Sequence, residues 1–223
     1  IISDNKNLIN LFNGAKYDVV ITKSKVLIRK FPEYLILYNI LGSAYQNIGD
    51  LKLAKEIFLK GLNLEPNNIS IMNNLGNTLK NLGEFTLAEN LFKKIIKSKP
   101  NYINAYVNLG NLKRDSNDFN SAIELYTQAL KINKKNPVVL YSIALAYQGL
   151  GKFRIAIEYA QRVLDIEPKF TQADSLISQS IKYEDGNKHF EDMNLKVNNL
   201  ELDDHQKVNL LFALAKANED TNQ

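Results

Sequence analysis

The sequence predicts an all-α protein, a right-handed superhelix of stacked helical hairpins with extra helices at its C-terminal end. Gly42, Gly76 and Gly110 follow one another at intervals of 34 residues, and Ala144 occupies the next position of this series. An alanine follows each of the four residues after twelve positions, and a proline closes three of the four units. A fixed period of this length is typical of arrays in which every repeat is one pair of antiparallel helices.

The residues around these positions recur with the same period. In the first unit they read Tyr38-x-x-Leu41-Gly42-x-x-Tyr45, and an aromatic residue, Phe58, lies four positions after Ala54. The corresponding stretches begin at Met72, Tyr106 and Leu140, and the corresponding aromatic residues are Phe92 and Tyr126. We expect the glycine of the first helix to face the alanine of the second, because a larger side chain there would overpack the crossing at a cost of ~1–3 kcal/mol. The aromatic residues are then expected to fill the space between successive hairpins.

The turn inside each hairpin carries a residue suited to left-handed backbone. Glycine stands there in three units, at Gly49, Gly83 and Gly151, and Asn117 replaces it in the remaining unit. Asparagine tolerates this conformation better than most residues do. The sequence therefore predicts the same turn in all four units.

Taken together, the pattern W/Y-x-x-L-G-x-x-Y…A-x-x-x-F…P at a period of 34 resembles the tetratricopeptide repeat. The resemblance covers roughly residues 35–170, which divide into units at 35–68, 69–102, 103–136 and 137–170. Residues 1–34 are similar to a degenerate repeat, in which Val20 and Ser24 replace the usual alanine and aromatic residue. Residues 171–223 are expected to form a capping helix over 171–183, followed by a C-terminal helical segment that is cut short at its end.

This resemblance implies a ligand-binding surface on the first helix of each hairpin, which lines the concave face in the family. Positions 2, 5, 9, 12 and 13 of each unit point inward there, and position 6 adds to them. We expect ten ligand-binding residues: Asn39, Asn73, Asn74, Asn77, Lys80, Asn104, Asn108, Asn111, Arg114 and Tyr141. A carboxamide has both donors and an acceptor, so a row of asparagines can hold a peptide backbone whatever its side chains are.

The asparagines at position 6, Asn74 and Asn108, resemble the asparagine ladder that holds extended polypeptide in O-linked N-acetylglucosamine transferases. The ladder has two rungs here, because Ile40 and Ser142 occupy the other two positions. The alternative interpretation is that asparagine is simply common in this chain and that these amides face water. A clamp for a C-terminal carboxylate, another use of the fold, needs a lysine at position 5, where this chain has asparagine, valine or tyrosine.

Composition argues against chemistry of the chain's own. The 223 residues carry a net charge of +4 and no cysteine, which excludes disulfides and thiolate metal sites, and we expect neither a metal nor a cofactor. The two histidines, His189 and His205, are predicted to be solvent-exposed and without a carboxylate partner. Residues 149–152, Gly-Leu-Gly-Lys, lack the spacing of a phosphate-binding loop and are predicted to be a turn.

The remaining partner classes follow from the same residues. Lysines are spread over outer helix faces among acids, whereas a nucleic-acid binder concentrates them on one face, so we expect no nucleic acid partner. No stretch reaches the ~20 apolar residues that span a bilayer, and we expect no membrane partner and a cytoplasmic protein.

We therefore expect a non-catalytic scaffold that binds proteins or extended peptides on its concave face. An alternative is suggested by residues 210–220, LLFALAKANED, which are similar to a linker in bacterial proteins where such repeats precede a sulfotransferase domain. In that case the chain would be the substrate-recruiting N-terminal arm of a larger transferase, of sulfotransferase or glycosyltransferase type. A third possibility is self-association through the C-terminal helices, whose apolar faces need a neighbour.

Overall fold

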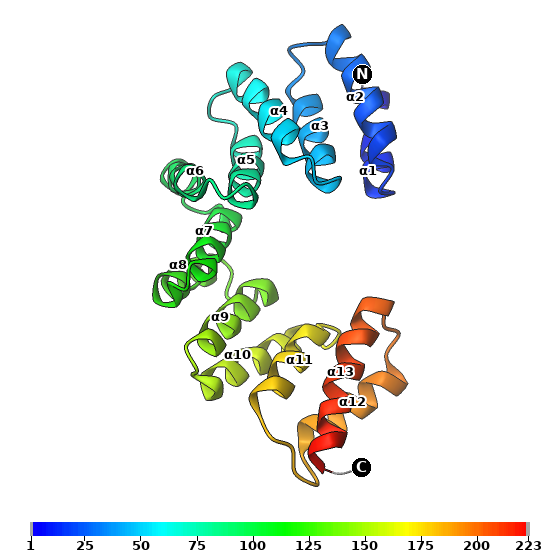
Figure 1. Ribbon diagram of the computed structural model, residues 1–223, viewed down its shortest axis with the longest axis vertical. Coiled ribbons are helices and arrows are strands. Elements are labelled where there is room, and N and C mark those ends of the chain that lie inside the picture. The colour runs from blue at the N-terminus through cyan, green and yellow to red at the C-terminus, as the bar shows by residue number, and fades with distance from the viewer. Residues whose placement is uncertain (1, 222–223) are drawn as a thin grey trace. The chain divides into compact units, whose positions relative to one another are not determined.

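A computed structural model describes residues 2–221 of the chain, and the side chains of residues 5–221 (Figure 1). The described residues form thirteen α-helices and no β-strand, which confirms the predicted all-α fold. The helices divide into two compact units, one up to Leu112 and one from Lys113 onward.

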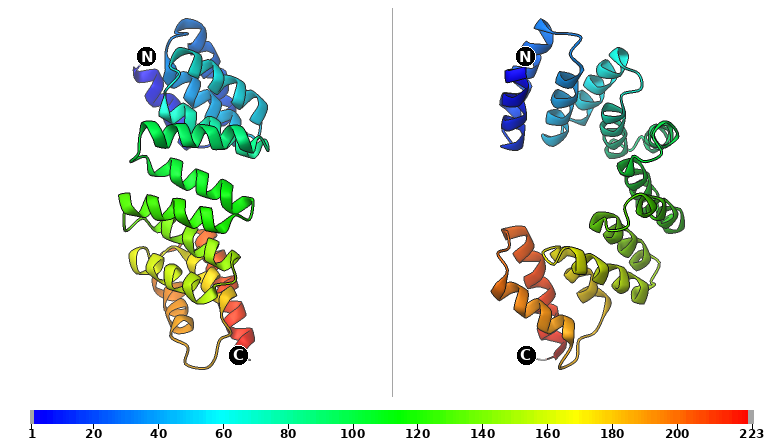
Figure 2. Two further views of the ribbon diagram at one scale, coloured as in Figure 1. Left: turned by 90° about the vertical axis from the view of Figure 1, so that its left-hand side faces the viewer. Right: turned by 180° about the vertical axis from the view of Figure 1, so that it is seen from behind.

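The helices follow the 34-residue period that the sequence predicts. In the first unit they are α1 (Ile2–Asn13), α2 (Tyr17–Lys30), α3 (Leu35–Asn47), α4 (Leu51–Leu64), α5 (Ile69–Asn81), α6 (Phe85–Ser98) and most of α7 (Ile103–Asp115). The second unit contains α8 (Phe119–Ile132), α9 (Pro137–Gly149), α10 (Phe153–Ile166), α11 (Thr171–Ser180), α12 (Lys188–Asn199) and α13 (Asp204–Thr221). Figure 2 shows the hairpins from two further sides.

The turns within the hairpins adopt the predicted left-handed backbone. The φ angles are +82° at Gly49, +78° at Gly83 and +69° at Gly151, and Asn117 takes a φ of +61° in their place. Polar side chains begin the helices on either side of these turns. Asp50 accepts a hydrogen bond from the backbone N–H of Leu53 at 3.1 Å, and asparagines at the starts of α5 and α9 do the same, which satisfies N–H groups that a helix leaves unpaired.

The small residue of the first helix makes room for an aromatic ring of the same hairpin. A Cβ atom placed on Gly42 would lie 2.5 Å from the ring of Phe58, and one on Gly76 would lie 2.5 Å from the ring of Phe92. Both rings are fully buried. The expectation that the glycine faces the alanine is therefore wrong, because the three atoms nearest to the added Cβ all belong to the ring. The ring lies one helical turn beyond the buried alanine on the same helix face, so it reaches the glycine first.

The C-terminal helices of the second unit have a core of their own. Tyr183 and Phe190 pack with Met193 of α12 and with Leu210 and Leu214 of α13, while α11 lies between α10 and α13. The prediction of a terminal capping helix over 171–183 is thus wrong, because α11 ends at Ser180 and α13 covers its other side.

A reciprocal side-chain cap begins α13. The side chain of Asp203 accepts from the N–H of Gln206 at 2.8 Å, and the Gln206 side chain accepts from the N–H of Asp203 at 3.0 Å. This reciprocal pair satisfies two helix-end donors.

We predict that Gly76→Ala destabilises the first unit more than Gly61→Ala does. Both changes gain helix propensity, but the added Cβ on Gly76 meets the rigid ring of Phe92 at 2.5 Å, whereas that on Gly61 first meets Cδ1, the movable end of the Ile71 side chain, at 2.8 Å. The difference in unfolding free energy, measured in urea, should be roughly 1–3 kcal/mol. Equal stability of the two variants would contradict this packing of ring against glycine.

Candidate functional site

Polar side chains gather on the first helices of the hairpins in the first unit. This amide face consists of Asn39, Ser43 and Gln46 on α3, Asn73, Asn74, Asn77 and Thr78 on α5, and Asn108 on α7. The face forms because α3, α5 and α7 each begin at the first residue of a 34-residue unit, so equivalent positions of the three helices point in the same direction.

Two hydrogen bonds join asparagines of neighbouring repeats. Asn74 Nδ2 donates to Asn39 Oδ1 at 2.9 Å, and Asn108 Nδ2 donates to Asn73 Oδ1 at 2.8 Å. In both cases position 6 of one repeat donates to position 5 of the preceding repeat, 35 residues earlier. The two rungs of the predicted ladder are therefore bonded within the protein, and the pattern ends where Val107 takes position 5.

A further contact fixes α3 against α5 beside these pairs. Gln46 Nε2 donates to Thr78 Oγ1 at 2.7 Å and to the backbone oxygen of Asn74 at 3.1 Å. Thr78 is fully buried, so its hydroxyl needs such partners. The amide face is thus a network whose side chains already have fixed positions.

The asparagine pairs do not use all the hydrogen-bonding groups of their side chains. A carboxamide offers two donors and an acceptor, and each Asn–Asn pair uses one donor and one acceptor. Asn73 is only 8% exposed, so it serves mainly to position Asn108. Asn39, Asn74, Asn77 and Asn108 are half-buried, and Asn104 is exposed. These five asparagines remain within reach of a ligand.

A depression of about 370 Å³ adjoins the N-terminal end of the amide face. Leu35, Ile36 and Ile71 supply apolar walls, and Asn39, Asn68 and Ser70 supply polar groups. It combines a place for an aliphatic side chain with amides at its rim.

The other predicted residues have different surroundings. Lys80 and Asn111 are half-buried. In the second unit, Arg114 lies 3.2 Å from the carboxylate of Asp115. The ring of Tyr141 packs on Phe170 with centroids 5.1 Å apart, and its burial raises the pKa of Tyr141. These contacts give Tyr141 a packing role.

The second unit holds a polar cluster that the sequence did not predict. His189 is not a solvated histidine without a carboxylate partner, because its Nε2 lies 3.1 Å from Oδ1 of the fully buried Asp174 and its Nδ1 lies 2.7 Å from the Tyr183 hydroxyl. Lys196 Nζ donates to the same Asp174 oxygen at 2.6 Å. The signal in the sequence was Asp174, a single acid between the apolar residues Ala173, Leu176 and Ile177, since a buried carboxylate requires partners.

The cluster connects α11 to α12. A neutral imidazole can accept from the Tyr183 hydroxyl at Nδ1 and donate from Nε2 to Asp174, which uses both ring nitrogens. Burial, first of all, raises the pKa of Tyr183 to about 12, so the phenol keeps the proton that this arrangement requires. With Tyr183 1% exposed and Asp174 fully buried, the cluster forms an internal lock between α11 and α12.

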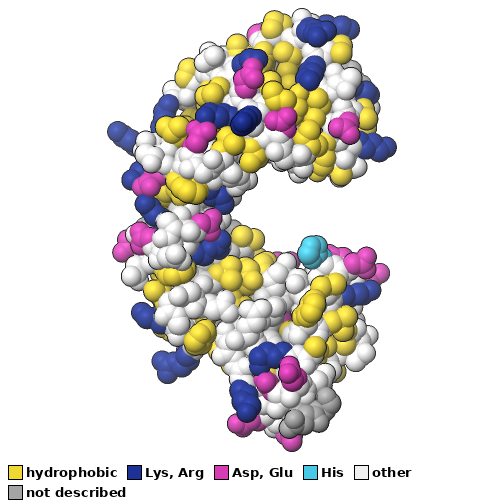
Figure 3. All heavy atoms as spheres, in the orientation of Figure 1, with side chains coloured by type: hydrophobic (Ala, Val, Ile, Leu, Met, Phe, Trp, Pro, Cys, Tyr) yellow, Lys and Arg dark blue, Asp and Glu magenta, His cyan; other side chains and the backbone are white. Residues whose placement is uncertain are grey.

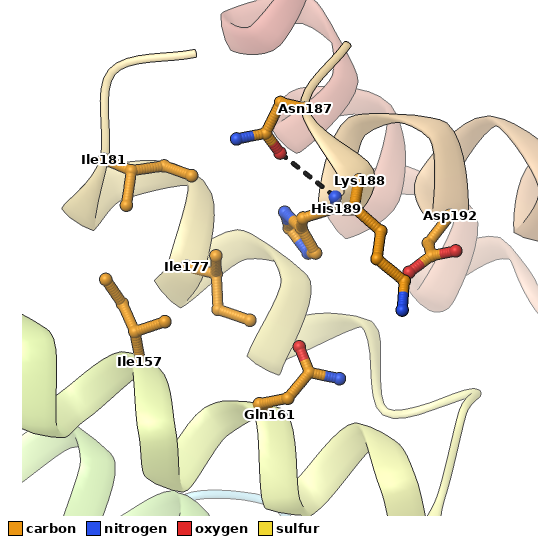
Figure 4. A pocket seen from close by; sticks show the side chains of 8 residues that line it. All are labelled: Ile157, Gln161, Ile177, Ile181, Asn187, Lys188, His189 and Asp192. Carbon is orange, nitrogen blue, oxygen red and sulfur yellow. Dashed lines mark hydrogen bonds between the residues drawn. The ribbon is translucent and has the colours of Figure 1, made fainter. Parts of the chain in front are cut away.

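A groove lies on the outer side of this lock (Figure 4). Its volume is about 320 Å³, with Ile157, Ile177 and Ile181 on one side and His189, Lys188 and Asp192 on the other. Lys188 and Asp192 place charges of opposite sign at the groove, so its lining favours neither an anionic nor a cationic ligand.

The period, the helix lengths and the interlocking of rings with glycines define an α-solenoid built from two-helix repeats. Three family models match the chain: two tetratricopeptide repeat models over residues 36–68 and 57–90, and the tetratricopeptide repeat protein 21 C-terminal ARM domain over residues 74–181. The chain therefore carries tetratricopeptide repeats, as the resemblance implied.

Solved structures share this fold. The type IV pilus biogenesis factor PilW has a TM-score of 0.76 at 17% identity, covering 93% of this chain and 96% of PilW. A thermophilic tetratricopeptide protein of Thermus thermophilus has a TM-score of 0.69 at 15% identity, covering 80% of this chain and 97% of its own. A chain of the APC/C hetero-tetramer Cut9–Hcn1 has a TM-score of 0.67 at 22% identity, covering 78% of this chain and 35% of its own.

No curated protein sequence matches the chain. The family models that match give no support to the sulfotransferase resemblance of residues 210–220. Within residues 2–221, no helix has the length and apolar character needed to cross a membrane.

We predict that Lys196→Met loosens the C-terminal helices of the second unit. The change leaves the Asp174 carboxylate buried without its cation, which typically costs about 3–5 kcal/mol. Amide hydrogen exchange of α12 and α13 should accelerate accordingly. Lys207→Met, which removes an exposed lysine of α13, serves as the control and should leave exchange unchanged.

The raised pKa of Tyr183 predicts a specific loss of stability in alkali. Unfolding returns the phenol to its ordinary pKa of 10.0, whereas the folded protein favours the neutral phenol up to about pH 12. This preference stabilises the folded state fully below pH 10, and the stabilisation is lost as the pH rises to about 12. Over this range the wild type should lose roughly 3 kcal/mol more unfolding free energy than Tyr183→Phe does. Parallel pH profiles of the two proteins would contradict the prediction.

Proposed function

We propose that the chain is a non-catalytic scaffold that binds an extended segment of another protein on the amide face of its first unit. The observation that carries this proposal is the pairing of asparagines across repeats. The pairs hold several carboxamides in place, and each Asn–Asn bond uses only one donor and one acceptor of the two side chains.

Fixed amides are suited to a ligand that is recognised by its backbone. Ordering a flexible polar side chain at an interface costs about 0.5–1.5 kcal/mol, and here that ordering already occurs on folding. An extended peptide presents one N–H and one C=O per residue, which match the donors and acceptors of Asn39, Asn74 and Asn108. Side-chain identity then matters little along this stretch.

The depression beside Asn39 adds selectivity for one side chain. Its walls are aliphatic, with Ile36 39% exposed, and burying a leucine or isoleucine side chain contributes roughly 1.5–3 kcal/mol. Because successive side chains of an extended segment point to opposite sides, a residue seated here leaves its neighbours turned away. The expected ligand is an extended segment with an aliphatic residue near one end.

The comparisons are consistent with a role in binding proteins. One similar chain belongs to the APC/C hetero-tetramer Cut9–Hcn1, an assembly of several chains, and PilW is a pilus biogenesis factor. At 17–22% identity these similarities concern the fold alone. The proposed ligand is inferred from the residues of this chain.

The test is selection of peptides from a random 12-residue display library on the immobilised protein. Enriched peptides should bind the double variant Asn39→Ala, Asn77→Ala about ten-fold or more weakly, since two lost hydrogen bonds are worth roughly 1–3 kcal/mol. The matched control is Asn63→Ala with Asn90→Ala, two exposed asparagines on the second helices of their hairpins. Absence of enrichment, or equal affinity of both double variants, would reject the amide face as the ligand site.

A further inference from the structure

The last helix, α13, is apolar on two opposite sides. Its inner side contributes Leu210, Leu214 and Ala217 to the core of the second unit. Its outer side carries an outer stripe of four residues, Val208, Leu211, Phe212 and Ala215, at the spacing i, i+3, i+4, i+7 of one helix face. Val208 is 48% exposed, Leu211 53% and Phe212 72%. Figure 3 shows hydrophobic side chains side by side over the end of this unit.

The exposure of the outer stripe cannot be relieved by turning the helix. Ser178 Oγ on α11 donates to the backbone oxygen of Ala213 at 3.1 Å, and Lys216 Nζ donates to the backbone oxygen of Ile181 at 3.1 Å. The backbone N–H of Tyr183 donates to the carboxylate of Asp220 at 3.0 Å, and Lys216 pairs with the same carboxylate. These bonds fix the rotation of α13 about its axis, and the outer stripe stays outside.

The outer stripe continues an existing series of packed helices. Within the second unit α11 packs against α9 and α10, and α13 packs against α11. A helix laid on the outer stripe would therefore contact α13 much as α13 contacts α11. An apolar helix face is normally buried against another element, so the outer stripe leaves one partner helix to be supplied.

We propose that this partner is α13 of a second copy of the chain, laid antiparallel across a two-fold axis between Leu211 and Phe212. The outer stripe is self-complementary about that point, because Val208 and Ala215 lie equally far on either side of it. The two-fold axis places Val208 of one copy opposite Ala215 of the other, a larger side chain against a small one. Isologous pairing of this kind is how most homodimers form.

Helix dipoles favour the antiparallel direction over the parallel one. The antiparallel arrangement brings Glu219, near the C-terminal end of α13, to the N-terminal end of the other copy, where the helix dipole is positive. By the same symmetry Glu219 lies opposite Asp204, so acidic side chains face each other in this arrangement as they do in a parallel pair. A parallel pair also aligns both dipoles, which makes it the less favourable of the two.

The size of the contact sets the expected affinity. The outer stripe and its flanking residues would bury roughly 1,000–1,200 Å² in total, at the lower limit of specific interfaces. A dimer with a Kd on the order of micromolar is expected, so the protein should change from monomer to dimer over an accessible concentration range.

The first experiment is sedimentation equilibrium of the full chain between about 1 and 200 µM. The wild type should dimerise, and Phe212→Lys should be monomeric throughout with unchanged helical content by circular dichroism. Leu195→Lys is the matched control, because Leu195 on α12 is 58% exposed but lies off the outer stripe, and this variant should dimerise like the wild type. A monomeric wild type, which would assign the stripe to a different protein, or a dimer indifferent to Phe212→Lys would overturn the proposal.

The second experiment fixes the direction of the pair, and it is simple because the chain contains no cysteine. Single variants Val208→Cys and Ala215→Cys are oxidised alone and as a mixture. The antiparallel pair predicts several-fold more disulfide between the two variants than within either one. More disulfide within each variant than between them would indicate a parallel pair and overturn the two-fold arrangement.

Discussion

The structure depends on one contact made repeatedly: an aromatic ring of the second helix of a hairpin pressed onto a glycine of the first. Gly42 receives Phe58, and Gly76 receives Phe92, each with room for no more than a hydrogen on the glycine. Because the rings are fully buried, this contact fixes both the distance between the two helices and their rotation about their own axes. Everything on the opposite side of the first helix, including the amide face, takes its position from that constraint.

Fixed helices explain why polar residues can face one another across repeats. When each first helix has the same orientation, position 6 of one repeat always lies beside position 5 of the repeat before it, and an asparagine at both positions yields a bond of 2.8–2.9 Å. Between α11 and α12 of the second unit a different contact positions the helices. There the fully buried Asp174 binds His189 and Lys196 from α12, and these polar bonds take the place of a ring and a glycine.

Periodic features were predictable from the sequence, and the others were not. The starts of the helices, the left-handed turn at Asn117 and the family all followed from residues spaced 34 apart. The ring–glycine contact was misassigned because sequence spacing says which residues share a helix face but not which atom reaches across first. The asparagine pairs were not predictable, because each depends on two adjacent positions in different repeats. The Asp174 cluster was not predictable either, because its members lie outside the 34-residue period.

The unit 69–102 differs from its neighbours in supplying both halves of the asparagine pair, with Asn73 accepting from the repeat that follows and Asn74 donating to the repeat that precedes. Two copies of this unit in tandem could therefore form the same asparagine bond with each other. Tandem duplication of this stretch of the gene would lengthen the array by one module and the row of paired amides by one bond, without any change of residue. Duplication of a neighbouring repeat would add no bond. The unit 35–68 has Ile40 in place of the donating asparagine, and the unit 103–136 has Val107 in place of the accepting one. Among the three repeats that contribute to the asparagine pairs, only the unit 69–102 can therefore extend the row of paired amides by duplication.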